Sequence, residues 1–293
     1  MSSDWVTIGD GELTAAINPF GAELSSLTDG TGREWMTDAD PAYWSGRSPL
    51  LFPIVGALNG GAYRLGDARY ELPQHGFARR RRFELVERAG DAVRFRLSDD
   101  AETRGVYPFA FSLDADYRLA GGVLTIASTV TNRGDTMMPA SFGYHPAFAW
   151  PLPGEAGREG HSVVFDQPEH APLARLEGGL IAGHDRASPL DRDGQTLVPS
   201  DALFAADALI WTSLTSRAVD YLGPGGARLR VGFSDAPALG IWTKPGARFL
   251  CIEPWWGYAD PAGFAGDFSD KPGIMALAPD EARSFVMTLE PRA

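Results

Sequence analysis

Apolar and polar residues alternate along one stretch of the chain, and this limits the possible folds more than any other feature. Every second residue from position 109 to 119 is apolar, and Ser112, Asp114, Asp116 and Arg118 lie between them. A period of two indicates a β-strand with one buried face and one polar face. Gly121-Gly122 then leads into a second strand-like run at 123–132. The sequence therefore predicts an antiparallel hairpin here.

Similar short runs recur along the whole chain, separated by 34 glycines and 22 prolines. They lie at 6–8, 13–17, 22–27, 83–87, 92–97, 208–214, 218–222, 227–233, 238–243 and 284–289. Helical signals are weak and cover a turn or two at 98–104 and 201–206. Many short strands with frequent turns are typical of a large antiparallel β-sandwich. We predict an all-β fold with all 293 residues in one domain, and long surface connections at 151–160 and 182–200.

Composition excludes several classes of protein. The net charge of −12 disfavours binding to nucleic acid, which needs a basic surface. Arg80 to Arg82, within the basic run that begins at Arg79, are interpreted as a solvated hairpin edge. The single cysteine, Cys251, forms no disulfide within the chain and is expected in the core. No signal peptide and no apolar run of membrane-spanning length is present, so we expect a cytoplasmic protein that binds no membrane.

The segment FLCIEPWWGYAD, residues 249–260, carries the first candidate for chemistry. Its apolar start predicts a buried strand that ends at Pro254, since proline cannot donate to a strand ladder. Glu253 would then be poorly solvated, which raises the pKa of its carboxyl group. Trp255 and Trp256 offer flat faces on which a sugar ring can stack. A salt-bridged glutamate beside core aromatics is the alternative interpretation.

Two of the five histidines stand out. His75 lies in PQHGFAR and His145 in FGYHPAF, whereas the other three have polar neighbours and are expected at the surface. His145 and Glu253 each precede a proline, which holds the preceding residue extended. Side chains fixed in this way suit an acid/base pair. The chain has no HExxH or HxH motif, no GxSxG, and no GxGxxG that follows a strand, so we expect no metal, no serine-hydrolase triad and no dinucleotide cofactor.

In this order, PQHGFAR, FGYHPAF and IEPWWGYAD resemble the aldose 1-epimerase (galactose mutarotase-like) superfamily, and most closely its LacX-like and glucose-6-phosphate 1-epimerase-like branch. The segments GAELSSL and YWSGRSPLLFPIVG are also similar, so the resemblance spans the chain from about residue 15 onward. It implies a large β-sandwich, the galactose mutarotase-like supersandwich, with a sugar site on a concave sheet face and no cofactor.

The resemblance also implies catalytic roles. Glu253 would be the general base that removes the proton of the C1 hydroxyl of a cyclic aldose. His145 would be the general acid that protonates the ring oxygen, and His75 would hydrogen-bond the sugar nearby. His145 must be cationic to donate; an ionised Glu253 beside it would raise its pKa, whereas burial without a partner would lower it.

Further residues are implied for substrate binding. Asp207 is the best match to an aspartate that binds sugar hydroxyls, and Trp255 or Trp256, or Tyr144, would stack on the ring. Arg47 and Arg79 would bind hydroxyls or a phosphate, because the arginine fork suits phosphate geometry.

The substrate stays open at this point. In the family the glycine of PIVG is often followed by a basic residue, whereas Ala57 follows here, which puts a sugar-binding cation in doubt. We therefore keep both an aldohexose and a hexose 6-phosphate as substrates of a 1-epimerase. A non-catalytic carbohydrate-binding sandwich, and a lyase or hydrolase that uses the same residues, are the other hypotheses. The expected partner is a small-molecule sugar, and the chain is expected to be a monomer or a homodimer.

Overall fold

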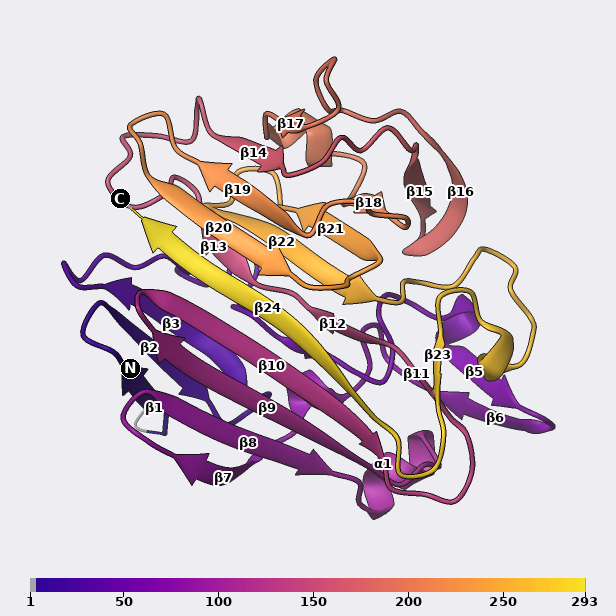
Figure 1. The fold of residues 1–293 in the computed structure, drawn as a ribbon. Helices are drawn as coiled ribbons and strands as arrows, with labels where there is room; N and C mark the ends of the chain where they lie inside the picture. Colours follow the sequence, from indigo (N-terminus) through magenta and orange to yellow (C-terminus); the bar gives the residue numbers. More distant parts are fainter. Residues whose placement is uncertain (1–3, 293) are drawn as a thin grey trace.

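A computed structural model describes residues 4–292, and most of its strands belong to two large antiparallel sheets (Figure 1). The nine-stranded sheet has the order β17 (Thr196–Leu197), β14 (Ser162–Phe165), β19 (Ala218–Leu222), β20 (Arg228–Phe233), β24 (Ala282–Arg292), β10 (Val123–Asn132), β9 (Phe111–Ala120), β8 (Ala92–Ser98) and β7 (Glu84–Arg88). The eight-stranded sheet has the order β16 (Leu180–Arg186), β15 (Leu173–Glu177), β18 (Leu209–Trp211), β21 (Ala238–Trp242), β22 (Phe249–Trp256), β12 (Phe142–Tyr144) and β4 (Leu50–Leu51), with β13 (Ala147–Ala149) also paired to β22. The predicted all-β class is confirmed.

Smaller elements complete the described part of the chain. The remaining strands form a three-stranded sheet and two pairs: β1 (Val6–Gly9), β2 (Leu13–Asn18) and β3 (Glu23–Asp29); β11 (Met138–Ala140) with β23 (Met275–Leu277); and β5 (Ala62–Leu65) with β6 (Ala68–Glu71). The helical elements are short: α1 (Ala101–Val106) and the 3₁₀ turns η1 (Asn59–Gly61), η2 (Ala78–Arg80), η3 (Asp201–Phe204) and η4 (Phe268–Asp270). Among residues 4–292 no helix has the length and apolarity needed to cross a membrane.

The hairpin predicted from the alternating stretch is β9–β10, which pairs along its whole length. The polar face of β9 is occupied by ion pairs with the neighbouring strand β8: Arg94 contacts Asp116 and Arg96 contacts Asp114. The apolar face of β9 is buried in the main core. The alternation of apolar and polar residues in the sequence therefore indicates which face of the sheet packs against the core.

The two large sheets are joined by side chains that reach across the core. Phe142 of β12 stacks on Phe285 of β24 with ring centroids 4.6 Å apart. The Tyr144 hydroxyl, also from β12, accepts from the Ser128 N–H at 3.0 Å and donates to the Phe285 carbonyl at 2.8 Å. These contacts fix the face of β12 and β22 that points toward the nine-stranded sheet. The opposite face of both strands is free to build a site.

The prediction that the strand around Glu253 ends at Pro254 is wrong. β22 runs on to Trp256, so Glu253 lies inside the strand, paired with Gly240 of β21. On the other side of β22, pairing passes from β13 to β12, and the Ile252 N–H donates to the Pro146 carbonyl in the break between them. Backbone N–H groups two residues apart point the same way, so the N–H that Pro254 lacks would face this break. The proline is tolerated because no ladder bond is lost there.

The predicted long connection at 182–200 is wrong in part. Its first residues belong to β16 and Thr196–Leu197 form β17. β16 contains polar and exposed residues, and its pairing with β15 has register shifts, so neither apolar alternation nor a strong β-type run marks it in the sequence.

Candidate active site

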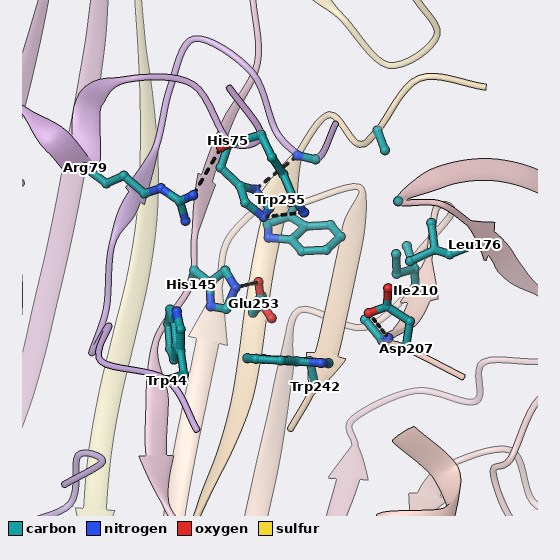
Figure 2. A pocket seen from close by; sticks show the side chains of 15 residues that line it. Trp44, His75, Arg79, His145, Leu176, Asp207, Ile210, Trp242, Glu253 and Trp255 are labelled. Carbon is teal, nitrogen blue, oxygen red and sulfur yellow. Dashed lines mark hydrogen bonds and ion pairs between the residues drawn. The ribbon is translucent and has the colours of Figure 1, made fainter. Parts of the chain in front are cut away.

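His145 and Glu253 meet on the outer face of the eight-stranded sheet. His145 directly follows β12, and Glu253 lies in the adjacent strand β22 (Figure 2). His145 Nε2 is 3.2 Å from Glu253 Oε2, and the side chains are 10% and 2% exposed. Among residues 4–292, His145 Nδ1 has no hydrogen-bond partner, and Glu253 Oε2 has none beyond its ion-pair contact with His145. Buried polar atoms without partners are costly, so this pair is arranged for a polar ligand rather than for stability.

Burial governs the protonation of the pair. It lowers the pKa of His145 to about 3 and raises the pKa of Glu253 well above its usual 4.5, with the charge of Asp207 adding to the rise. Both shifts favour neutral groups, and in this neutral form the pair holds one titratable proton in total. The ion pair of imidazolium and carboxylate holds the same single proton. A polar ligand can therefore convert one form into the other without any proton entering from solvent.

His75 is the second buried imidazole, and the backbone fixes its tautomer. The Gly56 N–H donates to His75 Nδ1 at 3.1 Å, so the proton of the neutral ring lies on Nε2. Burial lowers the pKa of His75 well below 6.5, with nearby His145 contributing, and keeps the ring neutral. Its ring centroid is 5.6 Å from that of His145. His75 thus presents an N–H at Nε2 beside the pair, and the side-chain amide of Gln74 lies 3.3 Å from this nitrogen.

The turn that carries His75 is held by tight backbone packing. His75 has a left-handed φ of 65°, and Gly76 follows with a φ of 70°. A Cβ on Gly76 would lie 2.2 Å from the Phe52 carbonyl oxygen, so only glycine fits. This glycine explains the HGF spacing of the sequence motif.

A cavity of about 280 Å³ opens over these three side chains. Trp44, Trp242 and Trp255 line it, and Leu176, Ile210 and Asp207 lie across it from His145 (Figure 2). The Trp44 ring centroid is 4.8 Å from that of His145. Small-molecule pockets typically measure roughly 300–1,000 Å³ and combine apolar walls with a few polar groups. The cavity therefore suits a ligand of about monosaccharide size with several hydroxyls.

Six of the eight predicted site residues line this cavity: His75, Arg79, His145, Asp207, Glu253 and Trp255. Arg79 Nη2 donates to the Gln74 carbonyl at 3.2 Å, and Gln74 also lines the cavity. Asp207 stands on the exposed rim with a left-handed φ of 77°, a conformation that a residue with a Cβ adopts rarely.

Tyr144 and Arg47 lie elsewhere, and the structure does not favour their predicted contacts with sugar. Tyr144 points into the core between the sheets, because it precedes His145 by one residue and so faces the opposite side of β12. Arg47 Nη1 donates to the Thr37 carbonyl at 2.6 Å, and its guanidinium lies over the Trp5 ring.

The same alternation separates the two tryptophans that the sequence could not distinguish. Trp256 is in the core with its Nε1 donating to Asp235, whereas Trp255 shares the face of Glu253. His161, expected at the surface, is instead buried, and its Nε2 accepts from the Leu152 N–H.

Trp44 and Trp242 were missed as site residues. Trp44 stands in the segment YWSGR, and Trp242 near the end of the run at 238–243. Both are half-buried in the structure and pack edge to face, with ring centroids 5.8 Å apart. A tryptophan beside a strand end carries no sequence signal that separates a cavity wall from the core.

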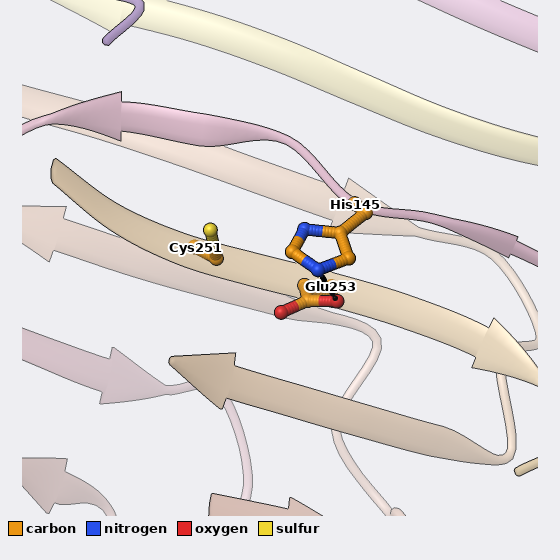
Figure 3. Close-up of side chains that lie close together, drawn as sticks. All are labelled: His145, Cys251 and Glu253. Carbon is orange, nitrogen blue, oxygen red and sulfur yellow. Dashed lines mark ion pairs between the residues drawn. The ribbon is translucent and has the colours of Figure 1, made fainter. Parts of the chain in front are cut away.

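One group among the described residues could in principle hold a metal ion: His145, Cys251 and Glu253, whose ligand atoms lie within 4.8 Å of one another (Figure 3). Zinc accepts all three ligand types. Metal binding requires a thiolate, however, and burial raises the pKa of the Cys251 thiol well above its usual value. Cys251 is fully buried beside Phe249 and Ala147, so the surroundings favour the neutral thiol.

Comparisons with known proteins agree with the geometry of the site. The family model for aldose 1-epimerase matches residues 4–290. The chromosomal LacX protein of Lactococcus lactis is 33% identical over 277 residues, with 91% of this chain and 92% of that protein covered. Its plasmid-encoded counterpart is 32% identical over the same length and coverage.

Solved structures extend the similarity to the whole fold. A galactose mutarotase related enzyme from Lactobacillus acidophilus superposes with a TM-score of 0.93 at 31% identity, covering 99% of this chain and 97% of that one. A galactose mutarotase-like protein from Lactobacillus casei gives a TM-score of 0.90 at 29% identity, covering 98% and 100%. The predicted galactose mutarotase-like β-sandwich is thereby confirmed, as is the resemblance to LacX. The chain belongs to the aldose 1-epimerase family.

Proposed function

We propose that this protein is an active aldose 1-epimerase that interconverts the α and β anomers of an aldohexose. Membership of the family supports an isomerase that acts on a small sugar. The observation that carries the proposal is the buried pair of His145 and Glu253, 3.2 Å apart in a cavity with aromatic walls. The two oxygens that must exchange protons, the C1 hydroxyl and the ring oxygen, are bonded to one carbon. A pair of adjacent acid and base groups can address both at once.

The reaction uses the single proton that the pair holds. Binding of the sugar replaces the direct contact between the groups, with imidazolium at the ring oxygen and carboxylate at the C1 hydroxyl. Glu253 takes the hydroxyl proton while His145 gives its proton to the ring oxygen, the C1–O bond to the ring oxygen breaks, and a free aldehyde forms. Rotation about C1–C2 and reclosure with the roles reversed gives the other anomer. Positioned proton transfer contributes roughly 10²- to 10⁴-fold, and every proton is conserved.

His75 and the walls would orient the sugar. The fixed Nε2–H of His75 is proposed to donate to a sugar oxygen near the ring oxygen, and Trp44, Trp242 and Trp255 offer faces for the apolar side of the ring. Asp207 on the rim is proposed to accept from hydroxyls far from C1. Pre-positioned groups of this kind hold the reacting atoms in line.

An unphosphorylated aldohexose fits the charges best. Among the described residues that line the cavity, Arg79 is the one permanent cation, and Asp207 on the opposite rim is an anion. Arg47 is committed to the Thr37 carbonyl, and Ala57 follows Gly56 where the family often has a basic residue. A phosphate would therefore meet a single arginine instead of a pair.

Polarimetry with freshly dissolved pure anomers tests the proposal. The protein is expected to accelerate the approach to anomeric equilibrium for one or more aldohexoses, and to act less on the corresponding 6-phosphates. A preference for the 6-phosphate would contradict the proposed substrate.

A 1-O-methyl glycoside distinguishes catalysis from binding alone, because it can bind but has no C1 hydroxyl proton to give. Saturation transfer to both the glycoside and the free sugar, without any acceleration of anomer exchange, would show a sugar-binding protein instead of an enzyme. Intact oligosaccharides after incubation would set aside a lyase or hydrolase.

A further inference from the structure

The last residue of the motif IEPWWGYAD, Asp260, has no part in the proposed chemistry but is buried beside it. Asp260 is 3% exposed, and its Oδ1 lies 3.1 Å from Nζ of Lys271, whose side chain is fully buried. Lys271 Nζ also donates to the Tyr258 carbonyl at 2.5 Å. Asp260 Oδ2 accepts from the Asn59 N–H at 2.8 Å. Both carboxylate oxygens thus face partners inside the protein, Oδ2 through a hydrogen bond and Oδ1 through its ion-pair contact alone.

Asp260 connects this ion pair to two walls of the cavity. Its backbone N–H donates to the Ala57 carbonyl at 2.9 Å, and its carbonyl accepts from the Ile181 N–H at 2.9 Å. Through Oδ2 and its N–H, Asp260 holds both ends of the segment 57–59. Ile181 lies on β16, just after Gly179, which lines the cavity.

The segment 56–59 in turn holds the backbone of His75 and fixes the tautomer of its ring. The Gly56 carbonyl accepts from the His75 N–H at 2.9 Å, and the Gly56 N–H donates to His75 Nδ1 at 3.1 Å. Gly56 has a φ of 75° and is packed so closely that a Cβ there would lie 2.5 Å from the Ala259 Cβ. The neighbour of Asp260 therefore limits the position of the donor that selects the His75 tautomer.

We propose that Asp260, anchored by Lys271, is a positioning residue: it holds the 56–59 segment so that Gly56 keeps His75 in the Nε2–H tautomer. Without the carboxylate, the Asn59 N–H loses its acceptor, and the hydrogen bonds that still tie the segment to residues 258–264 are those of the Ala57 carbonyl with the Asp260 N–H and of the Asn59 side chain with the Phe264 carbonyl. His75 Nδ1 would then lose a fixed donor, and the Nδ1–H tautomer would become accessible. That tautomer presents a lone pair from Nε2 to the cavity in place of a donor. The effect on catalysis rests on the proposed function, whereas the effect on the tautomer does not.

Two double variants separate positioning from loss of the buried charge. Asp260→Asn with Lys271→Met keeps an oxygen that can accept from the Asn59 N–H, whereas Asp260→Ala with Lys271→Met removes it. Neither leaves an unpaired buried charge, which would otherwise dominate the result. Thermal unfolding and circular dichroism establish that both variants are folded before they are compared.

The imidazole ¹⁵N shifts of His75, assigned by their loss in His75→Gln, are the readout that a merely structural role would not move. The Asn-containing variant is expected to keep the wild-type Nε2–H pattern, and the Ala-containing variant to show averaging between the tautomers. In anomer exchange, the Ala-containing variant is expected to lose roughly 10- to 100-fold in kcat, because small displacements of a positioning group have effects of this size.

A wild-type ¹⁵N pattern in the folded Ala-containing variant would overturn the proposal, as would equal tautomer averaging in both variants. If the wild-type protein has no exchange activity, the proposed function fails, but the ¹⁵N comparison still decides the link from Asp260 to His75. Anomer exchange could also be normal in both folded variants while the tautomer changes in the Ala-containing variant alone. The link from Asp260 to the His75 tautomer then stands, and His75 does not limit the rate of the reaction.

Discussion

Replacing Glu253 by glutamine is expected to stabilise the protein while it removes activity. Glutamine resembles the neutral carboxylic acid that burial favours in the folded state, but it cannot ionise. The pKa of Glu253 is raised in the folded protein, so the wild-type carboxyl contributes its full stability below the unfolded pKa of 4.5 and loses it as the pH rises toward the folded value.

The size of the effect follows from linkage. Between pH 4.5 and the folded pKa, the wild type is expected to lose about 1.4 kcal/mol relative to Glu253→Gln for each pH unit. Two pH units within this interval shift the difference by about 2.8 kcal/mol, which is large beside a typical total stability of 5–15 kcal/mol. Whether the pair's single proton lies on Glu253 or on His145 does not alter the slope, since the number of bound protons is the same.

Urea unfolding of both proteins at intervals from pH 4.5 to 8 measures this difference. The pH at which the difference stops changing gives the pKa at which the folded His145–Glu253 pair loses its proton. Glu159→Gln, at an exposed site, is the matched control and is expected to follow the wild type at every pH. A difference that does not vary with pH, or that moves in favour of the wild type as the pH rises, would refute the argument that Glu253 is a desolvated base.

Three further predictions use the same geometry. The pH profile of kcat/KM is expected to fall at acid pH near the His145 pKa of about 3, where the pair takes a second proton, and at alkaline pH where it loses its proton; a profile with no alkaline decline would contradict one-proton catalysis. Trp242→Ala is expected to weaken sugar binding roughly 2- to 13-fold, equivalent to about 0.5–1.5 kcal/mol, in a saturation-transfer titration, and unchanged binding would remove this ring from the site. Tyr144→Phe is expected to cost about 1–3 kcal/mol in urea unfolding because the Ser128 N–H and Phe285 carbonyl lose their partner, with KM unchanged; a raised KM would return Tyr144 to the sugar site.

Much of the sheet structure could be predicted from local pattern. Val123–Asn132 and Ala218–Leu222 have the predicted bounds, because alternation and flanking glycines act within a few residues. The extension of β22 beyond Pro254 could not be predicted. It depends on the break between β12 and β13 in the neighbouring strand, more than 100 residues away in sequence.

Some residues of the candidate site could likewise be predicted from the sequence, and others could not. His145 and Glu253 were identified from short motifs and their resemblance to a family, and the structure brings them to 3.2 Å. Tyr144 was expected to stack on the sugar ring, yet it precedes His145 by one residue, and one residue along a strand reverses the side chain. Trp242 was missed for the converse reason, since its place in the cavity wall depends on which face of β21 turns away from the core.

The central claim is that Glu253 and His145 exchange protons with a bound sugar, and magnetisation exchange between the anomeric protons of an aldohexose measures this most directly. With wild-type protein and with Glu159→Gln, exchange between the α and β H1 signals is expected to exceed the uncatalysed rate. With folded Glu253→Gln it is expected to return to that rate, while saturation transfer shows that the sugar still binds. Exchange at the full wild-type rate in Glu253→Gln would contradict the account.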